Sequence, residues 1–177
     1  MVEEYRTFWR RFWAGTIDTL IMVLLLFPFF IFDDYFTSPE RSIIAIILWS
    51  VLYSIIAIGY SVLLHARYGQ TVGKMIAGVK VLDLSENRLP TLNQAFMRDI
   101  GYIVPAIYSF LYLSYVLLVG SYDPETHYET VPEQINSYAG TVWLIVEIIT
   151  MLFNEKRRAL HDLIAGTVVV KTSEVDV

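Results

Sequence analysis

The sequence contains no cysteine, and this absence removes several classes of function at once. Disulfide bonds, thiol catalysis and cysteine metal sites are all excluded. Charge is also scarce, since 18% of the residues are charged and 55% are hydrophobic, against about 25% and roughly 45–50% in soluble domains. The charged residues stand in short connectors between long apolar runs. The 177-residue chain is therefore predicted to be a single-domain integral membrane protein.

Four apolar segments are candidates for membrane-spanning helices: residues 12–32, 42–64, 100–120 and 138–153. A hydrocarbon core about 30 Å thick requires roughly 20 helical residues, so the first three segments are full length and the fourth is short. The sequence predicts an all-α membrane protein, a four-span transmembrane helical bundle with a short fourth span. That fourth segment, which contains Glu147, either crosses the membrane or lies in the interface.

Basic residues are almost absent from one side of the predicted membrane. Of the 13 lysines and arginines, Arg41 alone falls between the first two spans. The others precede the first span, lie in the connector 65–99, or follow the fourth span in the tail 154–177. The positive-inside rule therefore predicts a multi-pass protein of the cell membrane with both termini in the cytoplasm. A net charge of −5 without a large basic face argues against nucleic-acid binding.

The predicted cytoplasmic connector and tail contain signals of regular structure. Residues 79–84 alternate and are rich in β-branched side chains, which indicates a short strand. Thr167–Lys171 is a second strand-like run, and because a lone strand leaves backbone groups unpaired, the two are predicted to form a small cytoplasmic two-strand element. Thr91 and Gln94 have the spacing of a capping box, so a helix is predicted to begin near Leu92 and to continue into the third span.

Three glycines, Gly69, Gly73 and Gly78, punctuate the stretch "YGQTVGKMIAGVKV". The Gly73–Lys74 pair resembles part of a phosphate-binding loop. The earlier glycine is one position too close, however, and Met75 replaces the serine or threonine that would hold magnesium. Tight turns or close helix packing are the predicted roles of these glycines.

Three blocks of the sequence together resemble the RDD family of small bacterial membrane proteins, which is named for one arginine and two aspartates. The blocks are "RRFWAGTIDTLI", "GQTVGKMIAGVKVLD" and "RRALHDLIAGTVVVK". The positions that carry the resemblance are Arg11, Asp18, Gly69, Gln70, Thr71, Gly73, Lys74, His161 and Asp162. The resemblance implies a compact helical bundle with Arg11, Asp18 and Asp162 as the namesake residues. It also implies membrane transport, since cation–proton antiport has been ascribed within the family.

Asp18 is the single residue of the sequence that is most informative about function. An ionised carboxylate at the centre of a membrane costs about 2.5–3.5 kcal/mol on insertion scales, and such a residue is by default a candidate functional site. Arg11 lies on the same helix face but ~10 Å away along the axis, so each is expected to pair with another segment. Asp162 is the predicted partner of Arg11. The structural alternative is that an arginine–aspartate pair only locks the bundle and the tail together.

Glu147 is the second acid within a predicted span. If that span crosses the membrane, Glu147 lies deeper than Asp18 and approaches from the other leaflet. Two such acids facing one bundle interior could relay protons or cations. If the short span lies in the interface instead, Glu147 faces water.

The two histidines at the membrane edge, His65 and His161, lack a second ligand at metal-binding spacing. No metal site and no cofactor are expected. No nucleophile–base pair is visible either, so the protein is not expected to be an enzyme. Arg98 and Asp99 are interpreted as interface anchors at the start of the third span.

Two hypotheses of function remain. In the first, the protein transports monovalent cations in exchange for protons, with Asp18 and Glu147 as titrating ligands. Four spans are few for one pathway, so a homo-oligomer in the lipid bilayer is then expected. In the alternative, it is a non-catalytic accessory or assembly protein that binds a partner through its cytoplasmic connector and tail.

Overall fold

The computed structural model describes residues 3–37, 43–119 and 131–174. In chain order the elements are η1 (Glu3–Tyr5), α1 (Phe8–Thr37), α2 (Ile43–Tyr68), α3 (Val72–Ala77), β1 (Val79–Asp83), α4 (Leu92–Arg98), α5 (Ile100–Val119), α6 (Val131–Phe153), α7 (Leu160–Ala165), β2 (Thr167–Lys171) and η2 (Thr172–Glu174). Arg41 and most of the acidic loop after the third predicted span lie outside the described residues.

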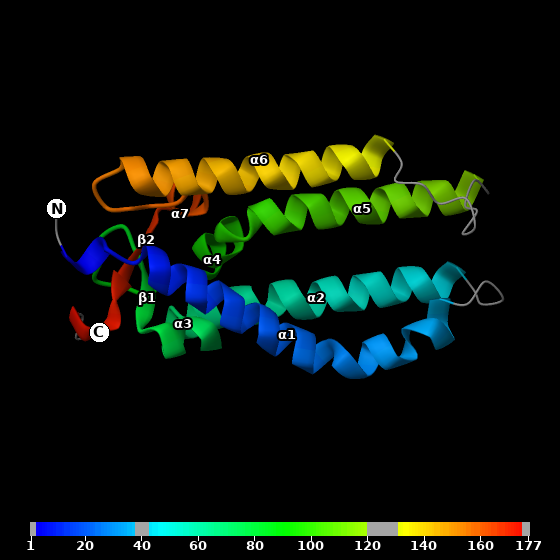
Figure 1. Cartoon of the computed structure of the whole chain (residues 1–177), viewed down its shortest axis with the longest axis horizontal. Helices are drawn as coiled ribbons and strands as arrows, with labels where there is room; N and C mark the ends of the chain where they lie inside the picture. Colours follow the sequence, from blue (N-terminus) through cyan, green and yellow to red (C-terminus); the bar gives the residue numbers. More distant parts are fainter. Residues whose placement is uncertain (1–2, 38–42, 120–130, 175–177) are drawn as a thin grey trace.

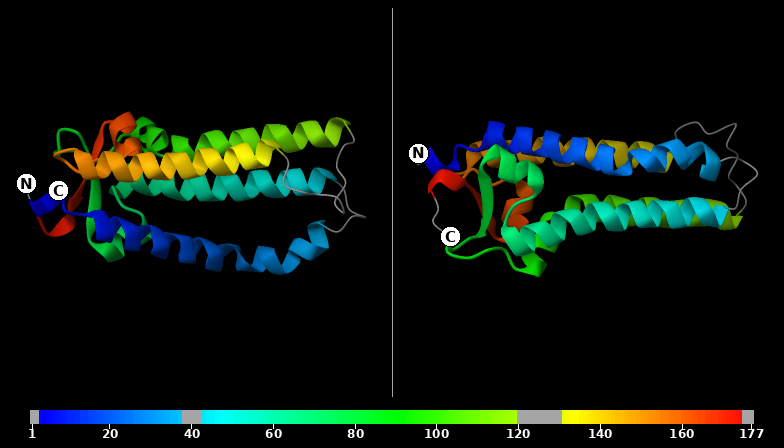
Figure 2. Two further views of the ribbon diagram at one scale, coloured as in Figure 1. Left: turned by 45° about the horizontal axis from the view of Figure 1, so that its top comes forward. Right: turned by 90° about the horizontal axis from the view of Figure 1, so that it is seen from below.

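The four long helices α1, α2, α5 and α6 run side by side along the long axis of the molecule, and consecutive ones run in opposite directions (Figure 1). Both termini lie at one end, together with the short elements α3, α4, α7, β1 and β2. We call this group of short elements the terminal unit. Figure 2 shows the same arrangement from two further sides. The fold therefore consists of a long helical bundle with one folded end.

Helix α6 is longer than the fourth apolar segment, whose predicted shortness agrees with the apolar stretch Ser137–Phe153. It has 23 residues and begins at Val131 rather than at residue 138. The polar residues at its start indicated a loop, but proline is tolerated and acidic residues are favourable in the first turn of a helix. Glu147 consequently lies six residues before the end of α6 at Phe153.

The bundle has the surface of a membrane protein. Among the described residues, one helix is long and apolar enough to cross a membrane: α2, through Val51–Tyr68 with a mean hydropathy of 1.3. Only 11% of that stretch is buried within the chain, and its other side chains are half-buried or exposed. A soluble protein would bury such a helix in its core. Ile100–Tyr112 in α5 and Ser137–Phe153 in α6 are shorter apolar stretches.

The predicted two-strand element is confirmed. Strands β1 and β2 pair antiparallel, with Val79 opposite Lys171 and Asp83 opposite Thr167. One face of the pair packs against Tyr5 through the fully buried side chain of Leu82. The N-terminus, the connector and the tail therefore share one small core.

Two helices of the terminal unit, α3 and α7, were not predicted. Thr71 caps the start of α3, and Gly78 ends it with a φ of 66°. Gly166 ends α7 in the same left-handed conformation, with a φ of 64°. A residue with a side chain is strained in that region, so both positions suit glycine.

The predicted start of α4 is confirmed, but its predicted continuation into the third span is wrong. Thr91 and Gln94 form the expected capping box. Helix α4 then ends at Arg98, and α5 begins at Ile100. Asp99 separates the two helices, with a backbone conformation outside the helical region, in keeping with the low helix propensity of aspartate.

Candidate functional site

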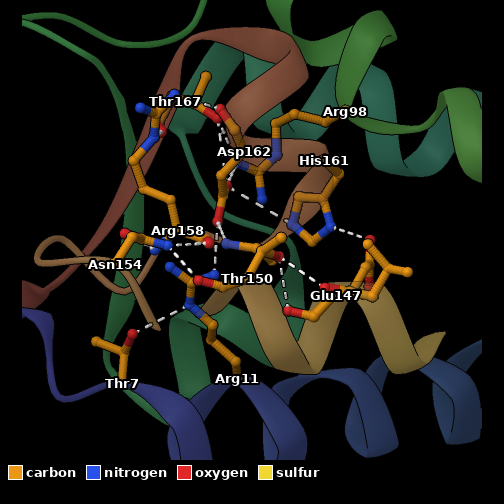
Figure 3. A network of polar contacts seen from close by, with 12 residues as sticks. Thr7, Arg11, Arg98, Glu147, Thr150, Asn154, Arg158, His161, Asp162 and Thr167 are labelled. Atoms are coloured by element: carbon orange, nitrogen blue, oxygen red, sulfur yellow. Dashed lines mark hydrogen bonds and ion pairs between the residues drawn. The ribbon is translucent and has the colours of Figure 1, made fainter. Parts of the chain in front are cut away.

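Asp162 is the centre of the first polar network, and its side chain is completely buried (Figure 3). Its Oδ2 accepts a hydrogen bond from Arg11 Nη1 at 2.6 Å, which confirms the predicted pairing. Its Oδ1 accepts from Arg98 Nη1, and the backbone N–H of Ala159 donates to Oδ2 at 3.1 Å. One carboxylate in α7 thus joins α1 and α4.

Positive charge exceeds negative charge around this carboxylate. Arg158 donates to the backbone oxygens of Asp162 and Thr167, each at 2.8 Å. Burial alone would raise the pKa of the Asp162 carboxyl, but the charges of Arg98 and Arg11 outweigh it and hold the pKa well below its ordinary range. Asp162 is therefore ionised in the folded protein at neutral pH.

Glu147 and His161 extend this network toward α6 (Figure 3). The Nδ1 of His161 faces Oε1 of Glu147 within hydrogen-bond distance, and Trp143 Nε1 donates to the same oxygen at 2.9 Å. The Nε2 of His161 lies 3.6 Å from Oδ1 of Asp162. Glu147 therefore lies beside the terminal unit, through His161, whereas a crossing span was expected to bring it in from the other leaflet.

Asp18 belongs to a second network. It accepts hydrogen bonds from Tyr60 Oη at 2.8 Å, from Thr71 Oγ1 at 2.6 Å and from the backbone N–H of Gly73 at 2.8 Å. Among the described residues, neither Arg11 nor Asp162 is a partner of this carboxylate. The structure thus divides the three namesake residues between two networks, and Asp18 holds α3 against α1.

Other residues of the block "GQTVGKMIAGVKVLD" also hold α3 and β1 in place. Gln70 Nε2 donates to the backbone oxygen of Val79 at 2.9 Å. Gly69 adopts a φ of 69°, and a Cβ there would lie 2.6 Å from the backbone oxygen of Val81.

Burial, followed by the charge of Arg98, lowers the pKa of the Lys74 ammonium to about 8.

Arg98 is the main residue that sequence reasoning missed, because it was interpreted as an interface anchor. Its side chain is 4% exposed, and besides Asp162 it donates to Thr167 Oγ1 at 2.7 Å. Its partners are 64 and 69 positions away, and no local pattern reports such a contact. Buried atoms without a hydrogen-bond partner in the described part of the chain are Arg11 Nη2, His65 Nε2 and Asp99 Oδ2.

The described residues contain no group of three or more histidine, aspartate or glutamate side chains placed to hold a metal ion. The first network instead pairs the carboxylate of Asp162 with arginines, and the second surrounds the carboxylate of Asp18 with neutral donors. Outward-facing apolar helices and arginine–aspartate pairs at one end define a helical membrane protein whose terminal unit is held by buried ion pairs.

The comparisons with known proteins agree with this class. The model of the RDD family matches residues 5–166, and the chain belongs to this family. It is also similar to the uncharacterized membrane protein YteJ of Bacillus subtilis (strain 168), with 24% identity over 175 residues, which are 96% of this chain and 83% of that protein. No solved structure matches the chain.

Proposed function

We propose that this protein transports a monovalent cation across the cell membrane in exchange for a proton. The proposal assumes four membrane-spanning helices, with both termini in the cytoplasm, as the positive-inside rule predicts. One observation carries it: the carboxylate of Glu147, inside the apolar stretch Ser137–Phe153, faces a histidine that also lies beside Asp162. We assign the exchange to this pair of residues.

Charge balance explains how such a pair could exchange ions. Histidine is the side chain whose charge changes most readily between pH 5 and 8. When His161 is protonated, it neutralises Glu147 at a site that is partly shielded from water. When His161 loses its proton, the positive charge beside Glu147 falls by one, and a monovalent cation would restore it. Cation binding and proton release would thus be coupled at one carboxylate.

Asp18 is less suited to this role than the sequence suggested. Its two oxygens already accept three hydrogen bonds from α2 and α3. Binding of a cation there would compete with these donors and release α3. We therefore assign a structural role to Asp18, which was the alternative interpretation of its sequence, and the ion-binding role to Glu147.

Proton flux in proteoliposomes tests the proposal. Vesicles with purified protein and an internal pH dye are exposed to gradients of Na⁺, K⁺ or Li⁺, and at least one cation should drive proton movement. Glu147→Gln removes the charge and should abolish the flux. Glutamine at position 161 cannot carry a proton, so His161→Gln should uncouple cation movement from proton movement.

Glu155→Gln is the matched control, because Glu155 is exposed just beyond the end of α6. It should leave the flux unchanged. Unchanged cation-driven flux in Glu147→Gln would contradict the assignment to Glu147. Absence of flux with every cation tested would contradict the transport proposal itself.

The second candidate is an accessory or assembly protein that binds a partner through the connector and the tail. The observation in its favour is that the two segments form one folded unit, in which Glu86 bonds both Tyr5 and Lys156. Leu84, in the turn after β1, is an exposed apolar residue of this unit. A stoichiometric partner that copurifies in detergent should be lost on Leu84→Ser but kept on Asn87→Ser. Transport by the pure protein alone would count against this candidate.

A further inference from the structure

We propose that helices α3, α4 and α7 lie within the membrane interface, with their outer sides in lipid. The residues concerned form what we call the apolar collar: Val72, Met75 and Ile76 of α3, Leu92 and Phe96 of α4, and Leu163 and Ile164 of α7. The terminal unit would then be partly embedded in lipid rather than suspended in water. This inference does not depend on transport.

The collar helices have an amphipathic pattern opposite to that of helices in water. In α7, Ile164 is 47% exposed while Asp162 is completely buried. In α4, Leu92 is 60% exposed while Arg98 is 5% exposed. A helix on a water-soluble protein turns its apolar side inward and its charges outward. The reversed pattern indicates that the surroundings of these helices are apolar.

Helix α3 has the same reversed pattern. Ile76 is 66% exposed, and Met75 beside it also faces outward. The inner side of the helix carries Gly73, whose backbone N–H donates to Asp18. Gly73 in α3, Arg98 in α4 and Asp162 in α7 are thus directed into the two networks, whereas the collar side chains of the same helices are exposed.

The sheet end of the terminal unit has the ordinary pattern of a protein in water. Val81, Leu82 and Val169 are fully buried, whereas Asn87 and Arg88 in the turn after β1 are exposed. A boundary between lipid and water therefore crosses the terminal unit. The short helices are on the lipid side of this boundary, and the turn is on the water side.

The short connections to the long helices also keep the collar near the membrane. Three residues separate α2 from α3, and a chain of three residues spans about 10 Å at most. One residue separates α4 from α5. Trp9 and Trp13 are exposed at the start of α1, against which α3 packs, and tryptophan is enriched at membrane–water interfaces.

The positions of the three helices favour lipid over a protein partner. Helix α3 packs on α1, α4 packs on α2, and α7 packs on both α4 and α6. The exposed apolar residues therefore form two separate groups, one on α3 and one on α4 with α7, rather than a single patch (Figure 1). Lipid surrounds a protein in this way, whereas a second copy of the chain would cover one side. The lipid would also exclude water from both networks and so strengthen the ion pairs of Asp162 and the hydrogen bonds of Asp18.

Single-cysteine variants can test this placement directly, because the natural sequence has no cysteine to remove. Ile76→Cys, Leu92→Cys and Ile164→Cys are labelled with a nitroxide and reconstituted into vesicles of phosphatidylethanolamine and phosphatidylglycerol. Oxygen partitions into lipid and a charged or polar nickel chelate into water, so their effects on the spin label report its surroundings. Asn87→Cys serves as the water reference and Leu24→Cys, exposed on α1, as the lipid reference.

We expect the ratio of oxygen to nickel accessibility at the three collar positions to exceed that at Asn87→Cys several-fold and to approach that at Leu24→Cys. A ratio equal to that at Asn87→Cys would place the collar in water and overturn the inference. Exclusion of both reagents would show that protein covers the collar, and it would overturn the inference too. Because three separate helices are probed at exposed positions, loss of one variant to misfolding leaves two measurements.

Discussion

Replacement of Asp162 by asparagine should lower the free energy of unfolding by about 3–5 kcal/mol, because it leaves buried guanidinium groups without their counter-charge. The side chains of Arg11 and Arg98 are 11% and 4% exposed, and both donate to this one carboxylate. Neither can move into water without separating α1 or α4 from α7. Thermal or denaturant unfolding in detergent, followed by circular dichroism, measures the loss.

Asp83→Asn is the matched control, since Asp83 also pairs with an arginine in the terminal unit. Its partner Arg88 is 78% exposed, so the loss should be about 1 kcal/mol or less. A double-mutant cycle of Asp162→Asn with Arg11→Met should give a coupling energy above about 1 kcal/mol. An Asp162→Asn variant no less stable than Asp83→Asn would contradict a central role for the Asp162 network.

The same network predicts a dependence of stability on pH. The pKa of Asp162 in the folded protein is held below its ordinary range by Arg98 and Arg11, against the effect of burial. The pKa in the unfolded chain is about 3.9, so the stabilisation is complete above that pH and is lost as the pH falls toward the folded value. The difference in stability between the natural protein and Asp162→Asn should therefore be constant near neutral pH and shrink below about pH 4.

Gly73→Ala should destabilise the protein by about 3 kcal/mol or more, at or above the upper end of typical overpacking costs. A Cβ at this position would lie 2.2 Å from the backbone oxygen of Ala14 and 2.8 Å from the carboxylate of Asp18. The first of these contacts is with the backbone inside α1, which can shift only at a substantial cost in free energy. Helix α3 would have to leave α1, and Asp18 would lose the N–H of Gly73.

Gly15→Ala provides a control of opposite sign in the same region. Apart from its own turns of helix backbone and its two neighbours in the chain, no atom lies within 4 Å of a Cβ at Gly15. Alanine is favoured over glycine inside a helix by about 0.5–1 kcal/mol. That variant should be as stable as the natural protein or slightly more stable. If both substitutions have the same effect on unfolding in detergent, the close approach of α3 to α1 does not contribute to stability.

The parts of the fold that were predictable have local signals. The strands over 79–84 and 167–171 follow from alternation and β-branching, and their pairing follows from the need to satisfy backbone groups. The start of α4 follows from the spacing of Thr91 and Gln94. Helices α3 and α7 have six residues each, too few for apolar periodicity to show. Their capping residues, Thr71 with Gly78 and Asp162 with Gly166, were the available signal.

The candidate site was predicted only in part, because most of its contacts join residues far apart in the sequence. The pairing of Arg11 with Asp162 was correct because both stand at the same predicted membrane edge. The partners of Asp18 and the second arginine on Asp162 were not foreseen. Nor was the position of Glu147, because the start of α6 was taken for a loop.

By itself, the sequence determined the class of protein, the small sheet and the family, because composition, periodicity and the spacing of residues within short blocks are properties of neighbouring residues. Only the tertiary structure decided which carboxylate meets which cation. Asp18 pairs with α3 across more than 50 positions, and Asp162 pairs with Arg11 across 151. Such contacts depend on how the helices pack, and packing between distant segments leaves no periodic trace along the chain.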